Sequence, residues 1–175
     1  MIDAAYLRNV IKDFRMYKSL GERAMAQVSD DQLHAQFDPE DTTIAIIVKH
    51  VAGNLRSRFT DFLTTDGEKP TRDRDGEFEM REAVSRAEMM AWWESSWAVA
   101  LASIDALTPD DLSSTVTIRG ERLLVVEVLN RLATHAAYHV GQIVWLARHF
   151  SGSRWISLSI PKNRSAEAGK GNKPA

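Results

Sequence analysis

Two histidines, His135 and His139, lie four residues apart in the segment HAAYH, inside the most apolar helical stretch of the chain. On an α-helix, positions i and i+4 lie on one face, one turn apart, so both imidazoles can reach one metal ion. Burying two imidazoles in an apolar face is costly unless something satisfies their nitrogens. Core histidines bonded to carboxylates or waters remain the alternative, because a bare HxxxH motif is weak.

A third ligand would favour the metal, since catalytic sites of the zinc type take three protein ligands and leave one position open. His50 is the best candidate, on the flank of a second amphipathic helix beside Ile46, Ile47 and Asn54. It lies about 100° around that helix from the centre of the apolar stripe. Helical geometry alone leaves open the alternative of a surface histidine at the edge of the helix.

The same helical geometry predicts how deeply the pair is buried. On the helix that carries HAAYH, His139 lies near the middle of the buried face and His135 lies toward one edge, near Gln142. Gln142 and Asn54 share faces with the proposed ligands, so they could orient an imidazole or bind substrate. Polar residues that serve only packing are the alternative at both positions.

The other two histidines are left out of the predicted site. His34 lies in an acidic connecting segment, and His149 lies at a helix C-terminus, where a histidine more often interacts with the helix dipole. The chain has no cysteine, so nitrogen and oxygen ligands must hold any metal. Imidazole suits several divalent transition metals, and the expected cofactor is zinc, nickel or iron, with its identity left open.

Four long helices are needed to position these residues. Apolar residues at helical spacing predict them at about 3–28, from 42 or 43 onward, at 86–106 and at 123–149. Residues 115–118 are β-branched enough for a short extended segment before the last helix. The predicted fold class is therefore all-α, a four-helix bundle.

One domain is expected over residues 1–160, followed by a disordered tail at 161–175 that is charged and rich in small residues. Residues 64–78 form a polar connection with two Asp-Gly turn signals. Basic and acidic side chains alternate in it, and they could rim a pocket. We interpret it as a solvated loop, because charge-rich connections are common.

Composition excludes several partner classes. The net charge of −2 over 175 residues gives no reason to expect nucleic acid or an anionic membrane as a partner. No apolar run approaches the roughly 20 residues that span a bilayer, and the N-terminus lacks the features of a signal peptide, so a cytoplasmic location is expected. Trp92, Tyr138 and Trp145 point away from the buried faces of their helices, which indicates a homodimer.

Several segments together resemble a bacterial branch of the DinB-like (YfiT-like) superfamily, from the first helix to about residue 160. They are HVAGN at 50–54, RSR at 56–58, DFL at 61–63, DGEKP at 66–70 and HAAYHVGQIV at 135–144. The resemblance implies a four-helix bundle, usually homodimeric, with His50, His135 and His139 as the metal triad. Members with a known activity are metal-dependent thiol transferases or isomerases that use bacillithiol, mycothiol or glutathione, and others are described as metal-dependent hydrolases. This branch mostly has no assigned activity.

Three functions follow as hypotheses, and whether the chain is an enzyme stays open. The first is a metal-dependent S-transferase that activates a small-molecule thiol for transfer to an electrophile. The second is a metal-dependent hydrolase with a metal-bound water, which usually needs a carboxylate base near the metal. Asp61 lies three turns from His50 and Glu127 points away from the histidines, so no base is assigned. The third is a non-catalytic dimeric metal-binding stress protein, although structural sites normally have four protein ligands.

Overall fold

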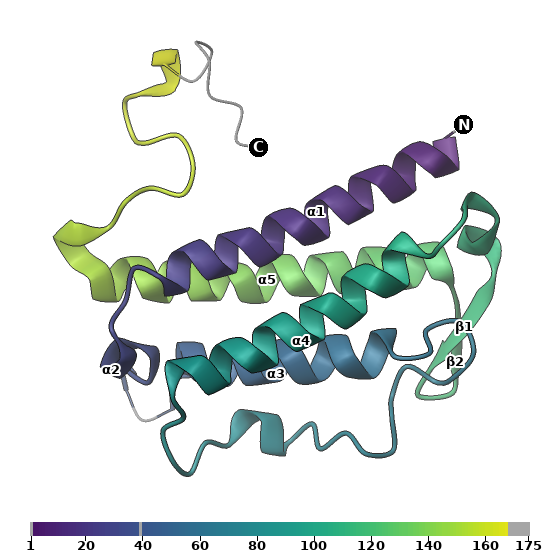
Figure 1. The fold of residues 1–175 in the computed structure, drawn as a ribbon, viewed down its shortest axis with the longest axis horizontal. Helices are drawn as coiled ribbons and strands as arrows, with labels where there is room; N and C mark the ends of the chain where they lie inside the picture. Colours follow the sequence, from purple (N-terminus) through teal and green to yellow (C-terminus); the bar gives the residue numbers. More distant parts are fainter. Residues whose placement is uncertain (1, 39, 168–175) are drawn as a thin grey trace.

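Four long helices pack side by side in the computed structural model, which describes residues 2–38 and 40–167 (Figure 1). They are α1 (Ile2–Met25), α3 (Ile44–Phe59), α4 (Arg86–Asp105) and α5 (Val125–Ser151). Helix α1 packs against α5 and α4, and α3 packs against α4 and α5, so the four enclose one apolar core. The prediction of a four-helix bundle is confirmed.

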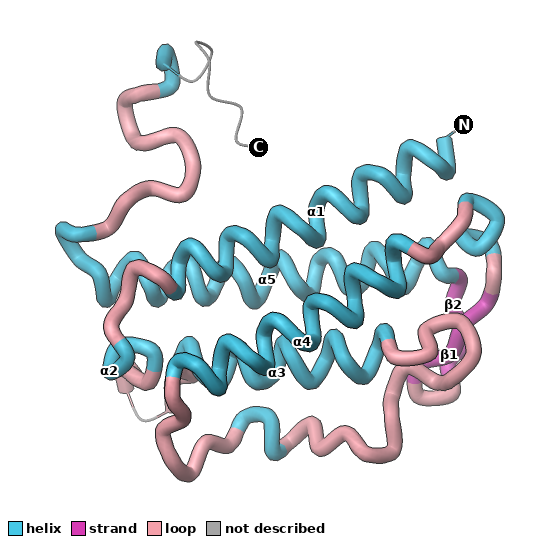
Figure 2. Tube along the Cα trace, in the orientation of Figure 1, coloured by secondary structure: helices cyan, strands magenta, loops and turns pink. Residues whose placement is uncertain are grey.

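Shorter elements connect the long helices (Figure 2). A two-stranded hairpin precedes α5, where the sequence predicts one extended segment, and its strands are β1 (Thr115–Ile118) and β2 (Glu121–Leu124). The remaining elements are α2 (Asp30–Leu33) and the 3-10 helices η1 (Gly76–Phe78), η2 (Pro109–Ser113), η3 (Gly152–Arg154) and η4 (Ser165–Glu167). In the part of the chain that the structure describes, no helix is long and apolar enough to cross a membrane.

The expected tail at 161–175 lies partly outside the described residues, which end at 167. The division into a domain at 1–160 and a disordered tail therefore stays a prediction.

Side-chain caps set where the two middle helices begin. The Thr43 hydroxyl accepts a hydrogen bond from the backbone N–H of Ile46 at 3.1 Å, and the Ser85 hydroxyl accepts one from that of Glu88 at 3.2 Å. Such caps satisfy backbone donors that have no partner inside the helix. The cap at Thr43 starts α3 so that His50 lies two turns into the helix, on its side toward α5.

The apolar stripes predicted for α3 and α5 form the middle of the core. Trp93 and Trp97 of α4 are fully buried among them, as their helical spacing predicts. Phe14 of α1 meets Phe59 of α3 edge to face, with ring centroids 5.7 Å apart, a favoured geometry for aromatic pairs. Phe14 also meets Trp97 edge to face, so this packing joins α1, α3 and α4, and the histidines lie where α3 meets α5.

The hairpin turn is attached to the segment that follows α3. Arg119 and Gly120 have φ of 56° and 77°, and positive φ at both central residues is typical of a two-residue type I′ turn. The Asp66 carboxylate accepts hydrogen bonds from the backbone N–H groups of Glu68, Gly120 and Arg119 at 2.7, 2.8 and 2.9 Å. One carboxylate thus joins the two segments that flank the site.

We expect Asp66→Ala to lower the melting temperature at pH 7 by about 3 °C, a typical effect for losing one stabilising interaction in a domain of this size. The hydrogen bonds from the backbone of Glu68 and Gly120 lower the pKa of Asp66 to about 2. The ionised carboxylate therefore stabilises the fold above the unfolded-state pKa of about 3.9, and this contribution is lost as the pH falls from about 4 toward 2.

Thermal unfolding followed by circular dichroism at pH 7 and pH 3 checks this expectation. The difference between Asp66→Ala and the wild type should be smaller at pH 3. Asp75→Ala is the control, because the Asp75 side chain is 96% exposed. A difference for Asp66→Ala that is equal at both pH values would show that the carboxylate charge does not matter.

Candidate metal centre

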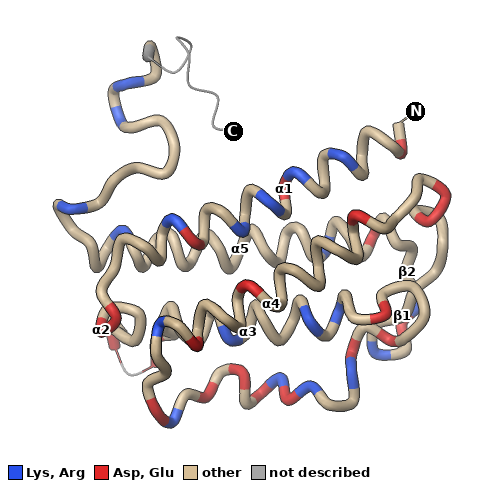
Figure 3. The backbone as a smooth tube through the Cα atoms, in the orientation of Figure 1, with Lys and Arg blue, Asp and Glu red and all other residues tan. Residues whose placement is uncertain are grey.

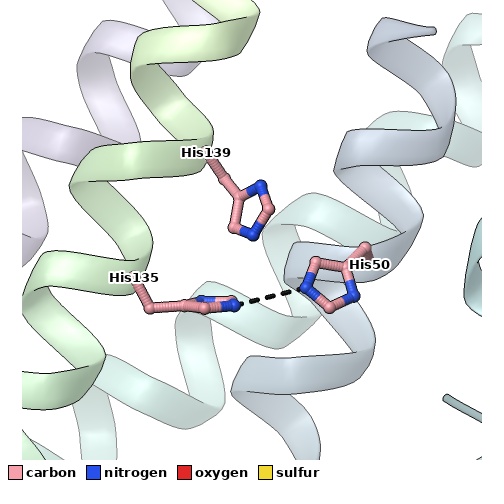
Figure 4. A group of neighbouring side chains, drawn as sticks. All are labelled: His50, His135 and His139. Atoms are coloured by element: carbon pink, nitrogen blue, oxygen red, sulfur yellow. Dashed lines mark hydrogen bonds between the residues drawn. The ribbon is translucent and has the colours of Figure 1, made fainter. Parts of the chain in front are cut away.

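Three imidazoles converge where α3 and α5 meet: His50 from α3, and His135 and His139 from α5 (Figure 4). One ligand nitrogen of each lies within 4.8 Å of the other two. The Nε2 atoms of His50 and His135 are 3.2 Å apart. Two nitrogens that each lie about 2.05 Å from one tetrahedral ion are about 3.3 Å apart. The structure thus brings together the three predicted residues in a cluster that could hold a metal ion.

Burial of the three rings differs from the sequence-based expectation. His50, expected on a flank, is only 4% exposed, whereas His139, expected near the middle of a buried face, is half-buried like His135. The expected order is wrong because the segment between α3 and α4 covers His50, with the Phe78 ring 4.5 Å from its own. The face of α5 that carries the other two rings borders a cavity.

Two hydrogen bonds determine which imidazole nitrogens face the cluster. His50 Nδ1 donates to Glu77 Oε2 at 2.9 Å, and His139 Nδ1 donates to Gln142 Oε1 at 2.8 Å. A proton on Nδ1 leaves the lone pair on Nε2 free. Histidines that bind metals almost always donate their other nitrogen in this way. The donor set therefore fits a cation at the centre of the cluster.

The protonation of the rings fits a cation as well. Burial, together with the neighbouring rings of His139 and His50 and the positive charge of Arg72, lowers the pKa of His135 to about 3. Burial also lowers the pKa of His139. Both rings are therefore neutral at pH 7, and neutral imidazole is the form that binds metal ions.

Glu77 is held in place by an arginine. Arg72 donates from Nε and Nη2 to the two Glu77 oxygens at 2.7 and 2.8 Å, and both side chains are buried. Burial alone would raise the pKa of Glu77, but the hydrogen bonds from Arg72 and His50 bring it below its usual value. Glu77 is therefore an ionised acceptor whose oxygens are both engaged.

Arg72 and Glu77 belong to the segment 64–78, for which the interpretation from sequence is a solvated loop. The segment runs along α3 (Figures 1 and 3). That interpretation is wrong for these two residues, because both side chains are buried and Glu77 bonds to His50 of α3. Gly53 makes the approach possible, since a Cβ at this position would lie 2.1 Å from Glu77 Oε1. A glycine inside a helix costs stability relative to alanine. Gly53, three residues after His50, is therefore the one sign in the sequence that another side chain packs closely against this face of α3.

The cluster forms part of the wall of a cavity of about 540 Å³. Asn54 also lines it, and Asn54 Oδ1 is buried with no hydrogen-bond partner among the described residues. No acidic residue is among the described residues that line the cavity, so Asp61 and Glu127 have no place in it. Five of its lining residues are arginines, namely Arg58, Arg72, Arg74, Arg119 and Arg131.

The remaining two histidines have other partners, and both lie outside the cluster. His34 Nε2 is 2.9 Å from the carbonyl oxygen of Val84. The His149 ring packs on Phe37 with centroids 4.2 Å apart.

Comparison with known families finds a match over most of the chain. The family model described as "Protein of unknown function (DUF1572)" matches residues 1–164. Comparison with curated proteins finds no significant match.

We expect Gly53→Ala to destabilise the protein by about 1–3 kcal/mol, the range for losing a partner of buried polar groups. The added methyl group must displace Glu77, which leaves His50 and Arg72 without their acceptor. Gly141→Ala on α5 is the matched control, because a Cβ there meets nothing within 4 Å. Both substitutions gain the same helix propensity, so their difference in denaturant unfolding isolates the clash. Equal stability of the two variants would contradict the geometry of Glu77.

Proposed function

The chain belongs to the DUF1572 family, and we propose that it is a metal-dependent enzyme that activates a low-molecular-weight thiol for transfer to an electrophile. The observation that carries this proposal is the position of the three-histidine cluster in the wall of a cavity. Three protein ligands beside an open space are typical of catalytic metal sites, whereas structural sites are usually closed by four. This favours an enzyme over a stress protein with a structural metal.

The resemblance to the DinB-like superfamily supports the same assignment. One histidine on the second long helix and an HxxxH pair on the last one define its metal triad, and His50, His135 and His139 match it. The four-helix arrangement places these residues together.

His50, His135 and His139 would hold a divalent transition-metal ion such as zinc, nickel or iron, which would supply a Lewis acid able to lower the pKa of a thiol. The chain's own residues prepare the ligands. Glu77 orients His50, Gln142 orients His139, and Arg72 keeps Glu77 ionised. Such supporting contacts typically change metal affinity 10- to 100-fold. Because the chain has no cysteine, the thiol must come from another molecule.

A thiol is favoured over a hydrolytic water because the described residues offer no free carboxylate base at the cluster. Glu77 is the acid bonded to the cluster, but its oxygens are engaged by Arg72 and His50, which also lower its pKa. A general base needs a free lone pair within reach of the reacting water. Hydrolysis is the second candidate, supported by the open side of the cluster that water can reach.

We expect His139→Ala to lose at least tenfold in bound transition metal relative to the wild type, because one of three nitrogen ligands is removed. Elemental analysis of purified protein, after loading with zinc and desalting, measures the ratio of metal to chain. His149→Ala is the matched control, since His149 lies on the same helix but outside the cluster. Unchanged metal content in His139→Ala, or equal loss in both variants, would defeat the assignment.

We expect thiols to bind directly at the metal. Titrating glutathione into cobalt-substituted protein should produce a sulfur-to-cobalt charge-transfer band, and glutathione S-methylated at sulfur should produce none. If thiols leave the spectrum unchanged while hydroxide or acetate alters it, the hydrolase should replace the thiol transferase.

We also propose a homodimer. Two large aromatic side chains of α5 are exposed, Tyr138 at 63% and Trp145 at 60%, and Trp92 of α4 is half-buried. Exposed aromatics are enriched where subunits meet. Sedimentation at micromolar concentration should give about twice the chain mass of 19.7 kDa, and Trp145→Gln should weaken the association. A single species near 20 kDa would contradict the dimer.

A further inference from the structure

We propose that the cavity beside the three-histidine cluster binds its substrate by an oxyanion group, a carboxylate or a phosphate, which the arginines of the cavity wall hold. This inference names the substrate class of the proposed enzyme and rests on the proposed function for the reaction. The binding itself depends on residues other than the three histidines.

The first observation is an excess of positive charge. Glu68 is shared by three arginines: its Oε2 accepts from Arg58 Nη2 at 2.9 Å and from Arg119 Nε at 2.8 Å, and its Oε1 lies 3.5 Å from Arg72 Nη1. Glu77 also pairs with Arg72. Within these side-chain ion pairs, three arginines share two glutamates.

Two further arginines increase that excess. Arg74 lies 3.6 Å from Asp75, and Arg131 lies 3.9 Å from Glu121, and both acids are exposed. Exposed ion pairs of this length contribute little, because water screens them. All of these arginines line a cavity whose described lining residues include no acid, so the positive field points into it and attracts anions.

The second observation is a buried donor that makes no hydrogen bond among the described residues. The Arg72 side chain is 4% exposed, and its Nη1 has no hydrogen-bond partner among the described residues. Nη1 lies 3.5 Å from Glu68 Oε1 without a hydrogen bond between them, and leaving a buried N–H without a hydrogen bond is costly. An oxyanion in the cavity would accept this hydrogen bond, and the planar guanidinium matches the oxygens of a carboxylate or a phosphate.

A third observation adds a polar requirement. Asn54 Oδ1, an acceptor, is buried without a partner among the described residues and lines the same cavity. A hydroxyl, amide or amino group on the substrate would donate to it. The substrate class is therefore a small molecule with an oxyanion at one end and a hydrogen-bond donor along its length.

The contacts also place the oxyanion near the reacting group. Arg72 bonds to Glu77, and Glu77 bonds to His50, so one carboxylate separates the guanidinium from the cluster. A cavity of about 540 Å³ is in the range of about 300–1,000 Å³ that holds small ligands. A ligand anchored at the arginines would thus present its other end to the histidines.

Isothermal titration calorimetry on the full chain, after a chelator has removed metal, tests the proposal at low ionic strength. The probes are succinate, inorganic phosphate and neutral succinamide. The variant is Arg119→Gln with Arg131→Gln, because both side chains are 56% exposed and their replacement should leave the fold intact, as circular dichroism would check. Arg8→Gln is the control for charge alone, since Arg8 is exposed and lies outside the cavity lining.

We expect succinate or phosphate to bind and succinamide not to bind. The double variant should weaken anion binding at least tenfold, and Arg8→Gln should change it less than twofold. The tighter of the two anions identifies the oxyanion as carboxylate or phosphate. No anion binding by the wild type, equal binding of succinamide, or equal weakening by Arg8→Gln would overturn the proposal.

The same titration separates this proposal from the proposed function. Metal-free His139→Ala should bind the anion within about twofold of the wild type, because His139 is not one of the anion-binding groups. A chain that binds anions through the arginines but takes up no metal would refute the enzyme and leave the anion site standing. Loss of anion binding in His139→Ala would overturn the arginine site.

Discussion

The hydrogen-bonding demand of three imidazoles at the contact between α3 and α5 constrains everything around them. An imidazole removed from water needs partners for both of its nitrogens. Two of the three Nδ1 atoms have protein acceptors, Glu77 for His50 and Gln142 for His139. The Nε2 atoms face one another, and burial keeps His135 neutral at pH 7. The lone pairs of the neutral Nε2 atoms are therefore directed at one point. A metal cation at that point can accept all of them, whereas one proton cannot.

The segment between α3 and α4 connects the histidines to the rest of the fold through hydrogen bonds. Asp66 binds the backbone of the hairpin turn, and Glu77, eleven residues later, binds His50. Arg72 lies between them and bonds to Glu77, so the supporting carboxylate is itself fixed. The geometry of the site thus depends on a connection without long secondary structure, anchored at both ends. Two of its arginines, Arg72 and Arg74, contribute to the positive charge of the cavity from which the anion site is inferred.

A feature of the fold or of the candidate site could be predicted from the sequence when its residues follow a repeating helical pattern. The long helices could be predicted, because their apolar residues recur at helical spacing and because Thr43 and Ser85 are typical capping residues. The convergence of His135 and His139 follows from their spacing of four. Helical spacing places His50 on the flank of its helix but does not show whether that flank is buried. The covering segment makes His50 more buried than its place on the helix predicts.

The supporting residues could not be predicted in the same way. Arg72 and Glu77 lie in a charged connection, where no periodicity distinguishes a buried ion pair from solvated side chains. Their burial results from a tertiary contact with Gly53, and the sequence indicates it only by a glycine inside a helix. The arginines of the cavity come from four separate parts of the chain, namely α3, the segment after it, the hairpin turn and α5, so only the folded structure reveals them as one group.

X-ray absorption spectroscopy of the zinc-loaded protein tests the central claim most directly, that three Nε2 atoms surround one ion. We predict a first shell with three imidazole nitrogens at about 2.0–2.1 Å and one exchangeable oxygen ligand. A sulfur ligand should replace this oxygen when a thiol is added. A first shell with fewer than three imidazoles, or one that is unchanged in His50→Ala, would contradict the account.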